Sequence, residues 1–297
     1  MVNAYHIPAM LAETIEGLNI QPDGVYVDVT FGGGGHSRAI MKDLHDGGQL
    51  FSFDQDADAL SNAIDDPRWT FVHSNFRYLR NWMDYYGIEE IDGLLADLGV
   101  SFHHFDCPER GFSFRFSAPL DMRMNQTAKR TAADIVNSYS EEDLAQIFYL
   151  YGELKNGRAI AKNICRARTQ KAIERTEDLV AASRIPAEMS KELARLFQAL
   201  RIEVNDEMGA LREMLVAARD LLKPGGRIAI LTYHSLEDRL VKNFLRSGNL
   251  EGTIEKDFYG NNLSPFTLIE KGREASQEEV ARNPRSRSAK LRVAEKK

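Results

Sequence analysis

A run of glycines and two nearby aspartates are the first residues in the chain that could do chemistry. Four glycines occupy positions 32–35 in the stretch VDVTFGGGGHS, Asp28 stands just before them, and Asp54 follows about twenty residues later. A loop without side chains lets a ligand lie against the backbone, and the N-terminus of a following helix offers free N–H groups. An acidic residue at the distance of Asp54 is placed to bind ribose hydroxyls. The pattern indicates a nucleotide-like ligand, although the glycines could be a mere connection and Asp54 a solvated strand end.

The spacing fits a nicotinamide cofactor as well as an adenosyl cofactor, and the residue after the glycines helps to separate the two. His36 stands where a strict G-x-G-x-x-G fingerprint needs a small residue. The chain also lacks a second complete mononucleotide-binding half of the kind that holds a nicotinamide. The sequence therefore favours a smaller adenosine-type ligand, S-adenosylmethionine above all.

Two further side chains stand at the ends of predicted strands. Phe76 follows one apolar run and Asp97 follows another. In open parallel sheets, ligands bind beyond the carboxyl ends of the strands, so both residues are expected at the crevice that holds the glycines. Phe76 could stack on an adenine or simply pack in the core. Asp97 could contact ligand or substrate, as ionisable groups in such places often do, or cap the following turn.

The elements that position these residues alternate between strand and helix over the first hundred residues. Strand-like runs occur at 25–30, 49–56, 69–76 and 91–99, and helix-like segments at 36–44, 57–64 and 78–86. Repeated βα units predict a parallel, doubly wound α/β sheet. From about 131 to 200 the pattern is purely helical, after which come a helix at 207–222, a strand at 227–235, a helix at 236–247 and strands at 253–258 and 266–272. We predict a Rossmann-like α/β domain (1–110 and 201–297) with an inserted all-α domain (111–200).

Composition excludes several classes of protein. The 297 residues carry a formal net charge of −6, which argues against a globally basic nucleic-acid binder. Cys107 and Cys165 form no CxxC pair, so neither a disulfide framework nor a metal site is predicted, and a reducing cytoplasm is the expected setting. The first residues do not resemble a secretory signal, and no apolar run approaches the ~18 residues of a membrane span. We expect a soluble cytoplasmic protein with no membrane partner.

Local groups of basic side chains nevertheless offer places for RNA. At 100° per residue, four basic side chains between 155 and 166 fall in one sector of a helix, opposite apolar ones. Residues 282–297 add seven Lys or Arg against one Glu. Such groups could contact phosphates, although a charged helix face is often only solvated. The candidate substrate contacts are Lys155, Arg158, Lys162 and Arg166 in the helix, Arg110, Arg115 and Arg123 in an aromatic-rich loop, His234 and Ser235 at a strand end, and Arg285 and Arg287 in the tail.

Nine motifs in order give the chain a resemblance to a known family. They are VDVTFGGGGHS, FDQD, LLADLGVS, DCPERGFSFR, PLDMRM, FQALRIEVN, LKPGGR, YHSLEDRLVK and NPRSRSAKLR. Together they resemble the ribosomal RNA small-subunit methyltransferase H family over nearly the whole chain. The resemblance implies a class I methyltransferase sheet. It also implies transfer of a methyl group from S-adenosylmethionine to the exocyclic N4 of a cytosine in bacterial 16S ribosomal RNA, at nucleotide 1402 of the small ribosomal subunit.

The same resemblance implies which residues hold the cofactor. They are Gly33, Gly34, Gly35, His36, Asp54, Phe76 and Asp97, while His104 stands where the family often has Gln. A bulky residue at Gly34 is expected to abolish cofactor binding and to leave the fold largely intact.

The implied reaction needs a group that accepts hydrogen bonds from the N4 amine, because the lone pair of this nitrogen is delocalised into the ring. A carboxylate there stabilises the positive charge that develops on nitrogen. Asp97 occupies the position where amino-methyltransferases commonly place a D/N-P-P-Y segment, so we predict that it is the catalytic residue. Three alternatives stay open: a methyltransferase of another substrate class, a non-catalytic RNA-binding assembly factor and, more distantly, a nicotinamide dehydrogenase. The oligomeric state is open, with a dimer as one option.

Overall fold

A computed structural model describes residues 8–99 and 107–297 and divides the chain into two compact units. One unit comprises Met1–Gly99 and Met208–Lys297, and the other comprises Val100–Glu207. Sequence analysis placed the boundaries at 110 and 201 instead. The difference arises because Arg110 donates to the carbonyls of Arg123 and Met124 in the helical unit, and because the last helix of that unit runs on to Asn205.

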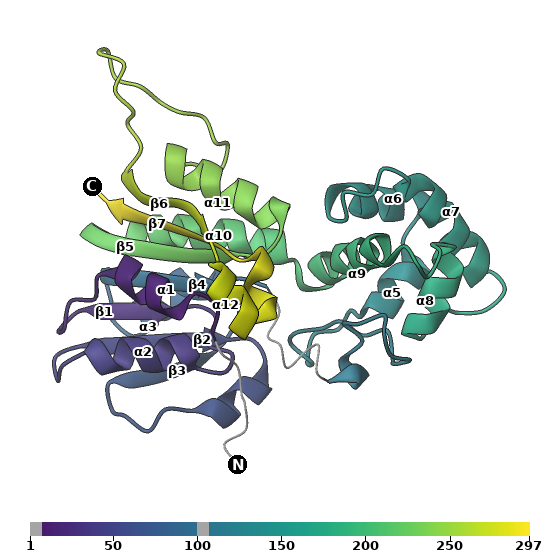
Figure 1. Cartoon of the computed structure of the whole chain (residues 1–297), viewed down its shortest axis with the longest axis horizontal. Helices are drawn as coiled ribbons and strands as arrows, with labels where there is room; N and C mark the ends of the chain where they lie inside the picture. The colour runs from purple at the N-terminus through teal and green to yellow at the C-terminus, as the bar shows by residue number, and fades with distance from the viewer. Residues whose placement is uncertain (1–7, 100–106) are drawn as a thin grey trace. The chain divides into compact units, whose positions relative to one another are not determined.

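The first unit is built on a seven-stranded sheet with the order β3-β2-β1-β4-β5-β7-β6 (Figure 1). Its strands are β1 (Val25–Asp28), β2 (Gln49–Asp54), β3 (Trp69–His73), β4 (Ile91–Asp97), β5 (Leu222–Thr232), β6 (Phe266–Glu274) and β7 (Lys290–Lys296). Strands β1 to β5 pair in parallel, whereas β7 is antiparallel to both β5 and β6. The predicted doubly wound α/β sheet is confirmed, and its strand order reverses between β1 and β4, where such folds bind ligands.

Helices cover both faces of this sheet. They are α1 (Leu11–Leu18), α2 (Gly35–Asp43), α3 (Leu79–Tyr85), α10 (Glu207–Leu221), α11 (Ser235–Ser247) and α12 (Gln277–Arg282), with the short 3-10 turns η1 (Ala57–Asn62), η2 (Phe76–Tyr78) and η4 (Pro284–Ser288). Leu94 packs with buried residues of α3, α10 and α11, while its neighbour Leu95 packs with those of α1 and α2. Burial on both faces explains why β4 is a continuous apolar run rather than an alternating one.

The second unit is helical, as its sequence pattern predicted. It contains η3 (Pro108–Arg110), α5 (Ala132–Ser138), α6 (Glu141–Leu150), α7 (Gly157–Arg168), α8 (Thr176–Ser183) and α9 (Ser190–Asn205). Ser140 caps α6 by accepting the Asp143 N–H, the contact that the sequence pattern suggested. Phe114 from the aromatic loop packs edge-on against Phe197, at 5.6 Å between ring centroids, so this loop helps to close the helical core.

One prediction for the end of the chain is wrong. Residues 253–258 form no strand and carry one isolated bridge, between Lys256 and Asn262. The second half of the basic tail is not a loose segment, because Lys290–Lys296 form β7 between two neighbouring strands, and phosphate contact by the tail stays a prediction. Arg292 is buried there, and its guanidinium donates to both carboxylate oxygens of Asp238, at 2.8 and 3.1 Å. The second half of the tail is thus a strand of the sheet.

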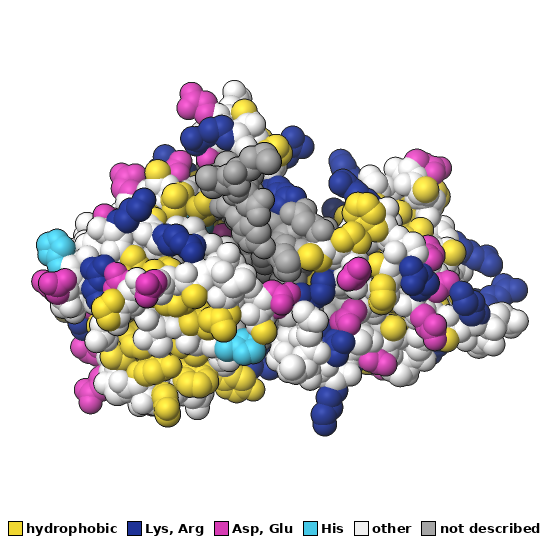
Figure 2. All heavy atoms as spheres, turned by 90° about the horizontal axis from the view of Figure 1, so that it is seen from below, with side chains coloured by type: hydrophobic (Ala, Val, Ile, Leu, Met, Phe, Trp, Pro, Cys, Tyr) yellow, Lys and Arg dark blue, Asp and Glu magenta, His cyan; other side chains and the backbone are white. Residues whose placement is uncertain are grey.

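The surface agrees with the modest net charge. On the face shown in Figure 2, basic and acidic side chains are interspersed rather than gathered by sign. Among the helices of the described residues, none is long and apolar enough to cross a membrane.

Truncation after Ser288 is expected to abolish cooperative folding, because it removes a strand that pairs with both β5 and β6. A domain is typically stable by only about 5–15 kcal/mol, and β7 also buries Leu291, Val293 and Ala294. The double variant Arg285→Gln/Arg287→Gln alters two exposed side chains and should retain the native circular dichroism spectrum and melting curve. A truncated chain with a native-like melt would show that β7 is dispensable.

Candidate active site

The glycine loop (residues 32–35) leads from β1 into α2 with a backbone that requires glycine. Gly32 and Gly34 have φ of +50° and +73°, in the left-handed region that residues with a Cβ avoid. The Gly34 N–H donates to the Phe31 carbonyl at 2.7 Å and closes the turn. A Cβ at Gly32 would approach only the Thr30 carbonyl, at 4.0 Å, so one side of the loop is open. The loop therefore offers bare backbone to a ligand at the start of α2.

Gly34 tolerates substitution less well than the sequence suggested. A Cβ there would lie 2.9 Å from two ring atoms of Phe31 and would collide with the Arg38 guanidinium, which donates to the Gly33 carbonyl. Together with the positive φ, this crowding would strain the loop itself. The expectation that a bulky residue at Gly34 leaves the fold largely intact is therefore wrong, whereas its effect on cofactor binding stays a prediction.

Asp54 ends β2 directly beside the glycine loop. Its Oδ2 accepts the Gly32 N–H at 2.8 Å, and its Oδ1 accepts the Asp56 N–H at 2.9 Å. These bonds fix a half-buried carboxylate next to the open side of the loop. Phe76 was predicted at the end of a strand. In the structure it begins η2, after β3 has ended at His73, and its half-buried side chain packs against the core. His104 lies outside the described residues.

Asp97 ends β4 and is held by polar groups from three other elements. Its backbone N–H donates to Thr30 Oγ1 at 2.6 Å, and its Oδ1 accepts from the Tyr233 hydroxyl at 2.6 Å. Its Oδ2 lies 3.7 Å from His36 Nδ1. Burial raises the pKa of Asp97 to about 7, an effect that the Tyr233 hydrogen bond opposes and the charge of Glu237 reinforces. A carboxyl that titrates near neutrality at a strand end is typical of a functional group.

His36 turns its side chain into the protein. The imidazole is 5% exposed, with Nε2 3.2 Å from the Ala9 carbonyl and Nδ1 facing Asp97. Burial lowers the pKa of His36, so the ring is neutral around pH 7. Because this side chain is engaged on both sides, a cofactor contact by His36 would have to come from its backbone at the start of α2.

Sequence analysis missed two residues that hold this site, Thr30 and Tyr233. Thr30 donates to Asp28 Oδ1 through both its N–H (3.0 Å) and its hydroxyl (3.3 Å), besides accepting from Asp97. Burial raises the pKa of Tyr233 well above its ordinary value, so its hydroxyl keeps the proton that it donates to Asp97. Their positions could have pointed to them, because Thr30 lies two residues after Asp28 and Tyr233 lies directly before His234.

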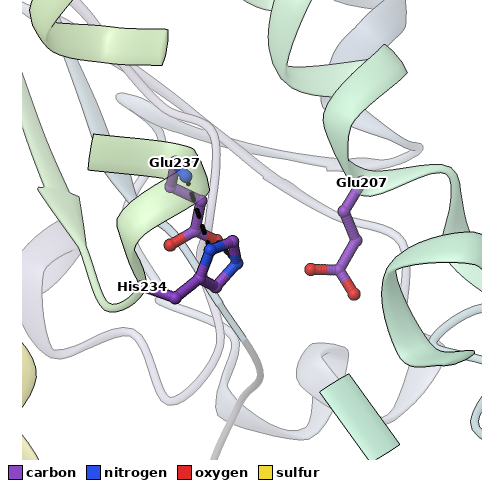
Figure 3. Close-up of side chains that lie close together, drawn as sticks. All are labelled: Glu207, His234 and Glu237. Carbon is purple, nitrogen blue, oxygen red and sulfur yellow. Dashed lines mark hydrogen bonds and ion pairs between the residues drawn. The ribbon is translucent and has the colours of Figure 1, made fainter. Parts of the chain in front are cut away.

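His234 was predicted to contact the substrate, and the structure shows it capping α11 (Figure 3). The Glu237 N–H donates to His234 Nδ1 at 3.4 Å, while His234 Nε2 lies 3.1 Å from Glu237 Oε1. Glu237 Oε2 accepts the Tyr233 N–H at 3.0 Å, which completes a reciprocal cap. The His234 side chain is 10% exposed, whereas Ser235 is exposed. Glu207, also drawn in Figure 3, begins α10, and the Arg201 guanidinium donates to its carboxylate.

Two of the three predicted arginines in the aromatic loop have structural partners. Arg110 donates to the carbonyls of Arg123 and Met124, at 2.9 and 3.0 Å. Arg123 forms an ion pair with Asp121, at 2.7 Å. Both side chains therefore hold the loop together, and Arg115 is the exposed one of the three.

The basic face predicted in the helical unit is present on α7. Arg158, Lys162 and Arg166 are exposed, as is Lys155 just before the helix. Ile160 and Ile164 are buried on the opposite side. In the other unit, Arg285 and Arg287 are exposed in η4. Substrate binding by these six residues stays a prediction.

Ionisation of Asp97 should destabilise the ligand-free protein. Because its folded-state pKa of about 7 lies above the unfolded value, the protonated form is favoured by folding. Its contribution to stability is complete below about pH 4 and is lost as the pH rises towards 7. The loss is at most about 4 kcal/mol, at 1.36 kcal/mol per pKa unit.

Denaturant titrations of wild type and Asp97→Asn between pH 4 and 8 measure this loss. The difference in free energy of unfolding between the two proteins should change over that range, with wild type losing stability relative to the variant as the pH rises. Parallel pH profiles would contradict the shifted pKa of Asp97.

Comparisons with known proteins show which family the chain belongs to. The family model described as the MraW methylase family matches residues 3–297. The chain is 61% identical to a protein of Parabacteroides distasonis and 59% identical to one of Bacteroides fragilis, each named ribosomal RNA small subunit methyltransferase H; each match covers 99% of this chain and 98% of the relative. A solved structure described as a putative rRNA-methylase from Clostridium thermocellum is more distant, at 13% identity and a TM-score of 0.46 over 98% of this chain and 100% of that chain. The chain belongs to the MraW methylase family.

Proposed function

We propose that this protein transfers a methyl group from S-adenosylmethionine to the exocyclic N4 of a cytosine in 16S ribosomal RNA, at nucleotide 1402 of the small ribosomal subunit. Membership of the MraW methylase family and the 61% identical relative support methylation of small-subunit ribosomal RNA. The choice of N4 and of this nucleotide rests on the motif resemblance. The observation that carries the proposal is the Asp97 carboxyl, fixed at the end of β4 by Thr30 and Tyr233.

The residues at the strand ends fit an adenosyl cofactor. The open side of the glycine loop leaves room for a ligand beside the backbone, and the first N–H groups of α2 follow it. The Asp54 carboxylate stands at the place where such folds bind ribose hydroxyls. When bound, S-adenosylmethionine supplies a methyl group already activated by its sulfonium. The protein's task is then to align the amine with it and to stabilise charge.

Asp97 is suited to the amine. Its Oδ1 is occupied by the Tyr233 hydroxyl, which leaves Oδ2 as the oxygen that can accept a hydrogen from N4. In the transfer, S-adenosylmethionine would supply the methyl carbon, with its sulfur keeping the electron pair of the broken bond, and the Asp97 carboxylate would take the proton that N4 loses as it bonds to carbon. A carboxylate beside N4 stabilises the positive charge that develops before the proton leaves. The active form is therefore the ionised one.

The RNA must present an unstacked base to such a site. The exposed basic side chains on and before α7 are proposed phosphate contacts, as are Arg115, Arg285 and Arg287. Arg110 and Arg123, which hold the aromatic loop, would act by shaping it. For the oligomeric state, a dimer is the option that we propose to test by sedimentation.

Asp97→Asn should lower kcat for methyl transfer about a hundredfold or more, because an amide oxygen is a weaker acceptor and cannot take a proton. In wild type, kcat should rise with pH through about 7 as the carboxyl ionises, and the variant should lack this rise. Affinity for S-adenosylmethionine, measured by calorimetry, should change by only a few-fold.

Asp92→Asn is the matched control, because Asp92 lies on the same strand and its carboxylate accepts from the Val25 N–H and from Lys223. It should cost stability and leave the pH profile of kcat unchanged. Near-normal turnover by Asp97→Asn would reduce Asp97 to a binding residue.

Asp54→Ala should weaken binding of S-adenosylmethionine by about ten- to a hundredfold, since hydrogen bonds to a charged group contribute about 1.5–3 kcal/mol. Calorimetry on the ligand-free protein measures this directly. Loss of the Gly32 and Asp56 contacts also loosens the loop, so the neighbouring Asp58→Ala, which lies in η1, is a control for local disruption. Equal affinities for Asp54→Ala and wild type would remove Asp54 from the cofactor site.

The reaction itself is tested with tritiated S-adenosylmethionine and small ribosomal subunits that lack the modification. Nucleoside analysis should recover the label as N4-methylcytidine. Label in N6-methyladenosine, or no label in RNA, would overturn the proposal and favour another substrate class or a non-catalytic role.

A further inference from the structure

Helix α11 presents an outer face that the proposed function has not used. The exposed side chains of this helix are Ser235, Arg239, Lys242 and Arg246. At 100° per residue these four positions fall within about 60° of one another. We call Arg239, Lys242 and Arg246 the α11 strip. The exposed charges of this helix are thus all positive, in a chain whose net charge is −6.

The other side chains of α11 are accounted for by the fold. Leu240, Val241 and Phe244 are buried against the sheet. The two acidic residues face inward, because Glu237 completes the cap with His234 and Asp238 binds the Arg292 guanidinium of β7. The acidic side chains of this helix therefore do not neutralise the strip.

Other helices of the same unit mix the two signs on their exposed faces. On α3, Arg80 forms an ion pair with Asp84 at 2.9 Å. On α10, the exposed Arg212 stands next to the exposed Glu213. Within the described residues, neither Lys242 nor Arg246 pairs its side chain with a carboxylate. Lys242 and Arg246 therefore differ from the charged residues of an ordinary solvated helix face, where i,i+4 pairs of opposite charge are common.

The helix that carries the strip starts at the candidate active site. Tyr233 donates to Asp97, and α11 begins two residues later at Ser235. From Ser235 to Arg246 the helix rises about 16 Å, at 1.5 Å per residue, along the outside of β5, β6 and β7 (Figure 1). A polyanion lying along the strip would have one end next to the strand end that carries Asp97.

We propose that the α11 strip binds the sugar-phosphate backbone of the ribosomal RNA substrate next to the nucleotide that is methylated. This inference rests on the proposed function. Arginine and lysine bind phosphates through charge-assisted hydrogen bonds, and arginine can do so with two at once. The strip contains no aromatic side chain on which a base could stack, so it positions the RNA without reading its sequence. It also shows how an acidic protein can hold RNA, through one local face rather than through its net charge.

The test is the triple variant Arg239→Gln/Lys242→Gln/Arg246→Gln, with RNA affinity measured by fluorescence anisotropy on 16S ribosomal RNA transcribed in vitro. We expect affinity at about 0.1 M salt to fall ten- to a hundredfold. The slope of log affinity against log salt concentration should decrease by about 2, since each phosphate contact to a single strand contributes about 0.7. Calorimetric affinity for S-adenosylmethionine and the melting curve should stay at their wild-type values.

The matched control is Lys42→Gln/Arg80→Gln/Arg212→Gln, which removes the same charge from exposed positions on α2, α3 and α10. If both triple variants lower affinity and salt slope equally, or neither does, the strip is not an RNA site and the inference is overturned. It is also overturned if binding of free RNA is normal and methylation of assembled subunits alone is impaired, because the strip would then contact a ribosomal protein. Failure of wild type to form N4-methylcytidine would instead overturn the proposed function, while the anisotropy would still report whether the strip binds RNA.

Discussion

The buried carboxyl of Asp28 is the constraint on which the rest of the site depends. A carboxyl group without access to water is costly unless it is hydrogen-bonded, and three donors surround this one. The Ser37 hydroxyl donates at 2.6 Å from α2, and Thr30 donates through its N–H and its hydroxyl. Thr30 in turn accepts the backbone N–H of Asp97 on β4. One set of polar contacts therefore fixes the start of α2, the chain entering the glycine loop and the end of β4.

Asp97 is a second carboxyl of this site whose pKa is raised by burial. Burial works against its charge and the Tyr233 hydroxyl works for it, so the carboxyl titrates near neutrality instead of being ionised throughout the physiological range. A group whose ionised form costs folding stability is retained where that form is useful, as active sites commonly show. Because the neutral His36 ring faces Oδ2 without a positive charge, it adds no ion pair that would lock the carboxylate. The ionised Asp97 carboxylate therefore lowers the folding stability of the protein and remains available to a substrate amine.

Sequence analysis could predict the sheet because its signals are local. Parallel strands buried on both faces are continuous apolar runs, and their carboxyl ends carry Asp54 and Asp97. What it could not predict depends on pairing between distant residues. The segment KLRVAEK looks like a basic tail until Arg292 is seen to bind Asp238, and the inward turn of His36 depends on the Ala9 carbonyl. From the sequence, a charged or polar side chain is expected at the surface because of its residue type. Whether it can be buried depends on a partner, which can lie far away in the chain.

The same limit applies to the search for an RNA surface in an acidic protein. Counting Lys and Arg along the chain favoured the last sixteen residues, where the structure uses Arg292 to join β7 to α11. The same count gave no weight to α11, because Glu237 and Asp238 offset two of the three positive charges of this helix in a linear sum. The helix separates the two signs: its acidic side chains turn towards His234 and β7, and its basic ones turn outward. A polyanion responds to the charge within about a Debye length of it, roughly 8 Å at physiological salt. Which side chains of α11 face the sheet and which face outward therefore matters more for RNA binding than the net charge of the chain.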